Sequence, residues 1–401
     1  MTGRASQPHP SDSIRSDGDL QEHVSLGIEA ALEERDASAF VTVGRLTDPP
    51  VRYCLLAVDS VTDFGYVVVD GGDGDHVTKL ENPYLAVGFD GDSWLIEAVS
   101  RRELAAGATH PASRLADTLE DGRRLLTPAS IPHDAALYLE GAGFDLASSR
   151  VLAQLRAEKT ESERHCLETA QRAVRAGLER VESILERAIV LDDAGVESDG
   201  SGTDASQPSQ RSLSLGDELL TASRLRRAIA SAITETGARP VSTTTSISGA
   251  VPASKPVVVA ATATTPSGYH GHLARTFVVE PEGGAERRGH VALTHAFRSI
   301  RSKVTADDHS VRALEADIEA EIRAFGFDES DSIDTRVSGI GLESSERPLG
   351  GGDLACLGST LRIEAAVGTG DERVRIADIL CRTADETRWL VPSSRSLLPG
   401  K

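Results

Sequence analysis

Apolar and polar positions divide the chain into a first part rich in short strands and a second part with longer helices. Amphipathic spacing predicts helices at residues 26–39 and 112–126. Runs of β-branched and aromatic residues predict strands at residues 39–43, 53–58, 65–69, 85–89 and 94–98. Strands mixed with helices in this way predict a small α/β domain over residues 26–150.

The second part opens with a long amphipathic helix. Apolar residues recur there at helical spacing, at Leu167, Ala170, Val174, Leu178, Val181 and Leu185. Further helices are predicted at residues 219–236, 289–304 and 309–325, and strands at 359–367 and 374–381. Residues 192–214 are rich in Gly, Ser, Asp and Gln, and they predict a disordered surface insertion because they bury too little apolar surface to offset their ordering entropy.

Residues 256–280 form the stretch around which this second part is organised. The β-branched run at residues 257–259 and the strand-like residues 273–279 flank a Pro-Ser-Gly turn signal that ends at Gly268. Glycine suits a turn position that needs a positive φ. The sequence therefore predicts a β-hairpin in the middle of the domain.

Several of its residues give this hairpin a family likeness. Gly268, Tyr269, Arg275 and Thr276, followed by residues 277–279, resemble the metal-binding hairpin of the creatinase, prolidase and methionine aminopeptidase family. Residues 338–343, Ser-Gly-Ile-Gly-Leu-Glu, are similar to the family's His-Gly-Ile-Gly-Leu-Glu loop. Residues 151–163 resemble the entry into the first helix of the family's C-terminal domain, and Leu46 to Tyr53 resemble a short segment of its N-terminal domain.

The resemblance implies an α+β fold of two domains. We expect a flexible tail at residues 1–25, a smaller creatinase-like α/β domain at 26–150, and a C-terminal pita-bread domain at 151–401 that contains the insertion. Within that second domain, Gly339 and Gly341 suit a close approach of backbone segments. Family members commonly pair, so the resemblance also implies a homodimer.

Active members of this family hold two divalent ions, which lower the pKa of a shared water and polarise the scissile carbonyl. The resemblance maps their two aspartates, histidine and two glutamates onto Ala261, His272, Ser338, Glu364 and Ala377. Alanine has no donor atom for a metal. Two proton-handling histidines of the family map to Ser345 and Asp334. The sequence therefore predicts an Xaa-Pro peptidase-like protein that is catalytically degenerate, has no cofactor, and binds a peptide or small ligand in a vestigial cleft.

Two alternatives remain open at this point. In the first, His270 and His272, two residues apart on one strand face, hold a single Mn, Co, Zn or Fe ion with Glu364 and support altered peptidase activity. Against it, His270 is interpreted as a surface residue near the turn and His272 as a hydrogen-bonded replacement for the carboxylate. In the second, the protein is a structural or regulatory dimerisation partner.

The predicted ligand cleft comprises Tyr269, His272, Arg275 and Glu364. Ser338 and Ser345 occupy vestigial catalytic positions. Asp378 follows the lost glutamate and is expected on the opposite strand face, and Arg275 is expected to pair with an acidic neighbour inside the domain.

Charge and composition narrow the functional classes. The formal net charge is −20, from 62 acidic and 42 basic residues, and only five of the basic residues are lysines. Such a surface is typical of a salt-rich cytoplasm, where ions screen self-repulsion, and it disfavours nucleic-acid binding. Four widely spaced cysteines predict reduced thiols. The sequence has neither a membrane-spanning apolar run nor the apolar core of a signal peptide, so we expect a cytoplasmic protein.

Overall fold

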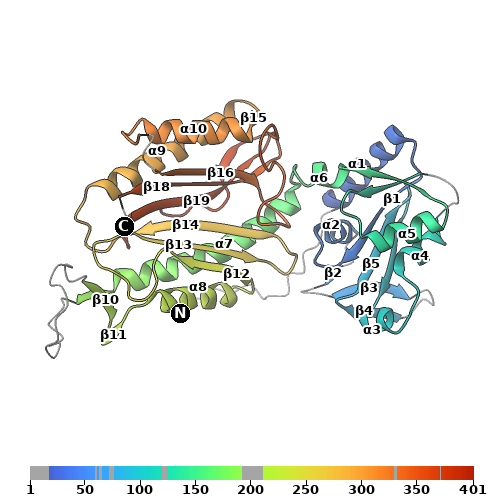
Figure 1. Ribbon diagram of the computed structural model, residues 1–401, viewed down its shortest axis with the longest axis horizontal. Helices are drawn as coiled ribbons and strands as arrows, with labels where there is room; N and C mark the ends of the chain where they lie inside the picture. The colour runs from blue at the N-terminus through green and yellow to red at the C-terminus, as the bar shows by residue number, and fades with distance from the viewer. Residues whose placement is uncertain are drawn as a thin grey trace, which may run out of the picture. The chain divides into compact units, whose positions relative to one another are not determined.

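The computed structural model describes residues 18–58, 61–62, 66–71, 76–119, 124–191, 211–328, 332–370 and 372–401. Most of the predicted tail, and residues 192–210 of the predicted insertion, lie outside these ranges. The chain divides into two compact units (Figure 1). The first comprises residues 1–166 and 266–268, and the second comprises residues 167–265 and 269–401. Among the described residues, helices long and apolar enough to cross a bilayer are absent.

The first unit is built on a mixed sheet with the strand order β6-β5-β1-β7-β8. Side chains of α4 and α5, including Leu115 and Leu139, pack with Val41 of β1 in its hydrophobic core. The elements of this unit are α1 (Asp19–Arg35), β1 (Ala39–Arg45), α2 (Pro49–Ala57), β2 (Val61–Thr62), β3 (Tyr66–Gly71), β4 (His76–Glu81), β5 (Tyr84–Phe89), β6 (Trp94–Val99), α3 (Arg101–Ala105), α4 (Pro111–Ala116), β7 (Arg124–Pro128), α5 (His133–Gly141), β8 (Asp145–Ser149) and α6 (Val151–Leu155).

Strands β1, β3, β5 and β6 confirm four of the five strand predictions in this unit, but the predicted strand at residues 53–58 is wrong. That stretch belongs to α2, which starts with Pro49 and Pro50 after Asp48. Proline favours the first helical turn because its φ is already helical and its missing N–H has no partner to lose there. The predicted helix at residues 112–126 is also too long, since α4 ends at Ala116 and β7 begins at Arg124.

The second unit is built on an antiparallel sheet with the strand order β12-β13-β14-β19-β18-β16, and β20 pairs with β19. The predicted hairpin is confirmed as β13 and β14, and Gly268 in its turn has a φ of 92°. The elements are α7 (Glu161–Glu186, which starts in the first unit), β9 (Ile189–Leu191), β10 (Ser212–Leu215), β11 (Glu218–Leu219), α8 (Ala222–Glu235), β12 (Arg239–Thr245), β13 (Val257–Thr264), β14 (His270–Phe277), α9 (Ala285–Ala306), β15 (His309–Ser310), α10 (Val311–Arg323), β16 (Ile333–Gly339), β17 (Leu354–Ala355), β18 (Thr360–Thr369), β19 (Glu372–Arg382) and β20 (Thr387–Trp389).

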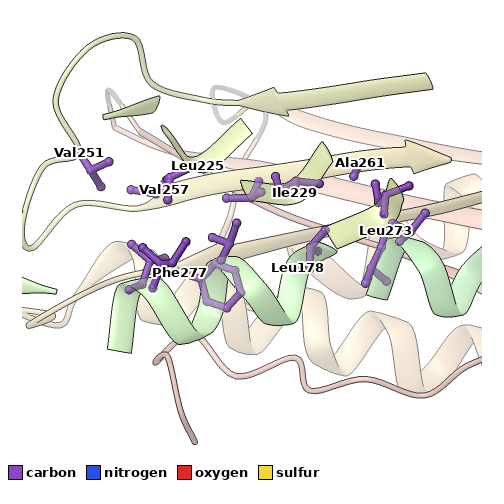
Figure 2. Close-up of a cluster of buried hydrophobic side chains, with 14 of the residues drawn as sticks. Leu178, Leu225, Ile229, Val251, Val257, Ala261, Leu273 and Phe277 are labelled. Carbon is purple, nitrogen blue, oxygen red and sulfur yellow. The ribbon is translucent and has the colours of Figure 1, made fainter. Parts of the chain in front are cut away.

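Four helices cover one face of this sheet. Leu178 of α7 and Ile229 of α8 pack on Val257 and Leu273 of the hairpin (Figure 2). Phe297 of α9 and the apolar side of α10 pack on β16, β18 and β19 in a second cluster. The predicted helices at 219–236, 289–304 and 309–325 are thereby confirmed as α8, α9 and α10. Their apolar stripes bury one face of the sheet and leave its other face to carry the site.

Candidate functional site

Strand register determines which side chains share the face opposite α7–α10. Across neighbouring strands, Thr262 pairs with His272, Ala274 with Ala377, Glu364 with Ala377, and Ser338 with Arg362. Cross-strand partners point to the same side of a sheet, and residues two apart on a strand do so as well. We call this surface the site face and define it by Thr262, His272, Ser338, Arg362, Glu364, Arg375 and Ala377.

Ala261, which the resemblance maps to the first metal-binding aspartate, does not lie on the site face, but its neighbour Thr262 does. Ala261 pairs with Leu273, and both belong to the hydrophobic cluster beneath α7 and α8. Thr262 is the residue that faces His272, and its Oγ1 lies 2.9 Å from His272 Nδ1 in a hydrogen bond. Sequence reasoning missed Thr262, and the register of the hairpin is the signal that identifies it.

Glu364 lies at the centre of the site face. The guanidinium of Arg362 donates to one carboxylate oxygen at 2.7 Å, and that of Arg375 lies 2.7 Å from the other. The imidazole Nε2 of His272 is 3.5 Å from the oxygen that Arg362 also contacts. Glu364 is therefore held between two positive charges. Sequence reasoning missed Arg362, which lies two residues before Glu364 on β18.

The protonation states of Glu364 and His272 follow from these contacts. Burial alone raises the pKa of Glu364, but contacts with His272, Arg375 and Arg362 hold it well below its usual range. Burial lowers the pKa of His272 to about 4, and the positive charges of Arg362 and Arg375 act in the same direction. At neutral pH the site therefore holds a carboxylate, a neutral imidazole and two guanidinium ions.

Helix α7 fixes the position of His272. The side-chain amide of Gln171 makes two hydrogen bonds with the His272 backbone, accepting from its N–H at 2.9 Å and donating to its carbonyl at 3.0 Å. A Cβ added to Gly271 would lie 2.5 Å from the carbonyl oxygen of Ala170, so glycine allows β14 to approach the helix backbone. Sequence reasoning missed Gln171, which lies 101 residues from its partner.

The loop after β16 contacts the start of β14. The backbone N–H of His270 donates to the carbonyl of Gly341 at 2.8 Å, and burial lowers the pKa of the His270 imidazole. A Cβ at Gly339 would lie 2.1 Å from the carbonyl oxygen of Arg347, and Gly341 is equally crowded by Glu346. The contact at Gly339 confirms the predicted close approach of backbone segments, whereas the atoms that crowd Gly341 belong to the Glu346 side chain. Tyr269 is buried at the hairpin turn, and Ser345 is half-buried in the loop.

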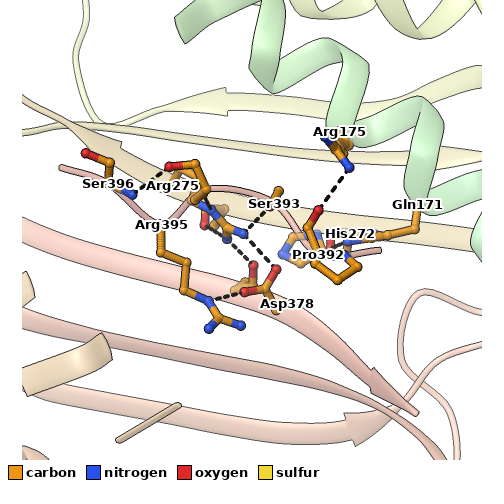
Figure 3. Close-up of polar contacts among 12 residues, drawn as sticks. Gln171, Arg175, His272, Arg275, Asp378, Pro392, Ser393, Arg395 and Ser396 are labelled. Carbon is orange, nitrogen blue, oxygen red and sulfur yellow. Dashed lines mark hydrogen bonds and ion pairs between the residues drawn. The ribbon is translucent and has the colours of Figure 1, made fainter. Parts of the chain in front are cut away.

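Arg275 lies on the other face of the sheet and pairs with Asp378. One guanidinium nitrogen of Arg275 donates to the Asp378 carboxylate at 2.8 Å, and Arg395 donates to its second oxygen at 2.6 Å. Figure 3 shows Asp378 between these two arginines. Both expectations for this pair are confirmed: Arg275 has an acidic partner, and Asp378 lies on the strand face opposite Ala377. The structure thus brings together His272 and Glu364 of the predicted ligand cleft and separates them from Arg275.

The residues at the mapped metal positions do not fit a pair of divalent cations. Ala377 offers no donor on the site face, and Ala261 points away from it. Both oxygens of Glu364 already face guanidinium groups, whose positive charge repels a cation at the same place. Within the ranges that the structure describes, groups of three or more His, Cys, Asp and Glu side chains arranged to hold a metal ion are absent, so His270, His272 and Glu364 do not form one here.

Comparisons with known proteins agree with this architecture. No protein-family model and no curated protein matches the sequence. Among solved structures, dipeptidase PepE from Mycobacterium ulcerans is similar with a TM-score of 0.66 and 19% identity, over 96% of this chain and 99% of that one. The Xaa-Pro dipeptidase from Bacillus anthracis has a TM-score of 0.65 and 14% identity, over 94% and 99% of the two chains.

A third similar structure carries a different name. The N-terminal domain of a FACT complex subunit from Cicer arietinum (chickpea) has a TM-score of 0.62 and 10% identity, over 94% of this chain and 97% of that one. The element order, the hairpin-centred sheet and the extent of these matches agree with the fold that the sequence motifs predicted. The chain therefore has the two-domain α+β pita-bread fold of the prolidases and Xaa-Pro dipeptidases.

Proposed function

We propose that this protein is a catalytically degenerate relative of Xaa-Pro dipeptidases that binds a small ligand on the site face. The position of Glu364 between Arg362 and Arg375 is the observation that carries the proposal. In a dinuclear hydrolase, carboxylates hold cations that activate a water molecule. Here Glu364, the one carboxylate retained at the mapped positions, is paired with two guanidinium groups. Unlike a metal ion, a guanidinium group cannot coordinate a water molecule and lower its pKa.

The fold by itself does not imply peptidase activity, because one fold can host unrelated functions. A FACT complex subunit has a similar N-terminal domain, so the architecture also serves in a protein that is named as part of a complex. Binding without hydrolysis is accordingly compatible with the fold. A cytoplasmic location and a homodimeric state stay predictions of the sequence.

A hydrolysis assay tests the proposal. Purified protein in high salt is offered Mn²⁺, Co²⁺, Zn²⁺ or Fe²⁺ and a series of Xaa-Pro dipeptides, with an active Xaa-Pro dipeptidase as the positive control. We expect no turnover above that of buffer with metal. Turnover that disappears in both Glu364→Gln and His272→Gln would contradict the proposal, because contaminating peptidase activity does not respond to these substitutions.

A single-ion peptidase is the second candidate, and one distance favours it. His272 Nε2 lies within 3.5 Å of a Glu364 oxygen, so two of its three proposed ligands are neighbours on the site face. This candidate predicts metal-dependent turnover that is lost in His270→Gln, whereas the binding proposal predicts no turnover in either protein.

A further inference from the structure

Positive charge is concentrated on the part of the site face that β16, β18 and β19 provide. Arg336 pairs with Glu364 across β16 and β18, and Arg373 lies two residues before Arg375 on β19, so all these side chains share one side of the sheet. Four arginines, at positions 336, 362, 373 and 375, and two carboxylates, Glu364 and Asp334, lie on these strands. Two further carboxylates, Glu343 and Glu346, lie in the loop after β16, which Arg362 contacts through the Ser344 carbonyl. The whole chain carries −20. The strands of this part of the sheet thus carry more arginines than carboxylates, unlike the chain as a whole.

The site face also contains polar atoms whose hydrogen-bonding capacity is unused. Ser338 and His272 are only 1% and 4% exposed. Among the described residues the Ser338 hydroxyl has no hydrogen-bond partner, and the nearest acceptor to His272 Nε2 is the Glu364 oxygen at 3.5 Å, at the outer limit of a hydrogen bond. The Nε atoms of Arg362 and Arg375 are buried without a partner in the same way. Unsatisfied buried polar groups cost free energy, and native proteins rarely leave several of them together. Such a group of atoms indicates a binding partner that is not part of the chain.

We propose that the site face binds a small oxyanion, the carboxylate or phosphate group of a ligand, beside Glu364. This inference rests on the proposed function, because cations at the same place would compete with the arginines. Arg362 and Arg375 supply planar donor groups that match the two oxygens of a carboxylate or phosphate. Glu364 holds both guanidinium groups in place before the ligand arrives, which reduces the ordering cost of binding.

Several side chains on this part of the sheet are exposed to solvent. The side chain of Arg375 is 25% exposed and that of Glu364 is 19% exposed, while Arg336 is exposed at the β16 edge. Arg336 thus lies at the exposed edge of this part of the sheet, and the pair of arginines around Glu364 is partly buried. Because burial lowers the effective dielectric constant, the inner contacts retain their strength in salt better than surface ion pairs do.

Calorimetric titration at fixed high ionic strength, with EDTA present, tests the inference. The probes are inorganic phosphate, the dipeptide alanyl-proline with a free carboxylate, and alanyl-proline amide. Saturable binding of phosphate identifies a phosphate ligand, and saturable binding of the dipeptide but not of its amide identifies a carboxylate ligand. Heat that grows linearly for both anions, without saturation, overturns the oxyanion site.

Substitutions locate the binding. Arg375→Gln removes one of the two arginines that hold the anion and leaves Glu364 paired with Arg362, and we expect its Kd to rise about tenfold, as for the loss of one charge-assisted hydrogen bond. Arg323→Gln on α10 removes an arginine whose ion pair with Glu319 lies on a helix, and its Kd should equal that of the unmodified protein. An unchanged Kd in Arg375→Gln overturns the assignment to this face.

The two proposals fail in different ways. Because EDTA is present, absence of anion binding overturns the oxyanion site and leaves the metal-free interpretation intact. Metal-dependent hydrolysis that EDTA abolishes overturns the proposed function and is measured independently of the titration.

Discussion

Replacing Glu364 with glutamine removes the negative charge that Arg362 and Arg375 share. The two guanidinium groups then remain on the site face without their common counter-ion, at 11% and 25% side-chain exposure. Glutamine has nearly the same shape, so the change isolates the charge. The substitution should therefore destabilise the folded protein through uncompensated positive charge instead of through a packing defect.

The structure sets the expected magnitude. Removing one partner of a fully buried ion pair costs about 3–5 kcal/mol. Glu364 keeps 19% of its side-chain exposure and Arg375 keeps 25%, so water screens part of the repulsion. We expect Glu364→Gln to lower the free energy of unfolding by roughly 2–4 kcal/mol.

Denaturant unfolding at fixed high salt measures this loss. Glu319→Gln serves as the matched control, since its exposed i,i+4 pair with Arg323 should be worth less than about 1 kcal/mol. The double variant Glu364→Gln/Arg362→Gln removes one of the two unpaired charges and should be more stable than Glu364→Gln alone. A double variant that is less stable than the single one would refute the electrostatic reasoning.

Three further predictions concern residues around the site. In the folded protein the pKa of His272 is lowered from 6.5 to about 4, so between these pH values the unfolded chain takes up a proton that the folded protein does not. The free energy of unfolding should therefore fall by roughly 2 kcal/mol from pH 8 to pH 5. Denaturant unfolding of His272→Gln at both pH values should lack this part of the decrease. Asp378→Asn leaves Arg275 poorly paired and should cost roughly 3 kcal/mol in denaturant unfolding, yet leave anion affinity unchanged, since Asp378 lies on the other face; a weaker affinity would contradict the two-face assignment. Gly271→Ala forces β14 away from the backbone of α7 and should cost about 1–3 kcal/mol in the same assay, and an unaltered stability would show that the approach is not tight.

Local pattern was sufficient to predict much of the second unit. The apolar stripes of α8, α9 and α10 and the β-branched runs of the hairpin each specify one buried face, and the structure uses those faces. In the first unit, α2 was mistaken for a strand because its β-branched and aromatic residues outweighed the helix-start signal of Pro49 and Pro50.

The site was less predictable because its details depend on register and long-range contacts. A shift of one residue in strand pairing moves a side chain to the other face, and this is why Thr262 and not Ala261 meets His272. Gln171 reaches His272 across 101 residues of sequence, and no local pattern marks such a contact. Arg362 lies only two residues before Glu364, but its role emerges only when Arg375 is placed on the other side of Glu364.

Metal content is the most direct test of the central claim that guanidinium groups take the place of cations around Glu364. The protein would be purified in high salt without chelator, offered Mn²⁺, Co²⁺, Zn²⁺ and Fe²⁺, exchanged into metal-free buffer and analysed by mass spectrometry. We predict far less than one equivalent of any metal per chain. One or two tightly bound equivalents that are lost in His272→Gln would contradict the account.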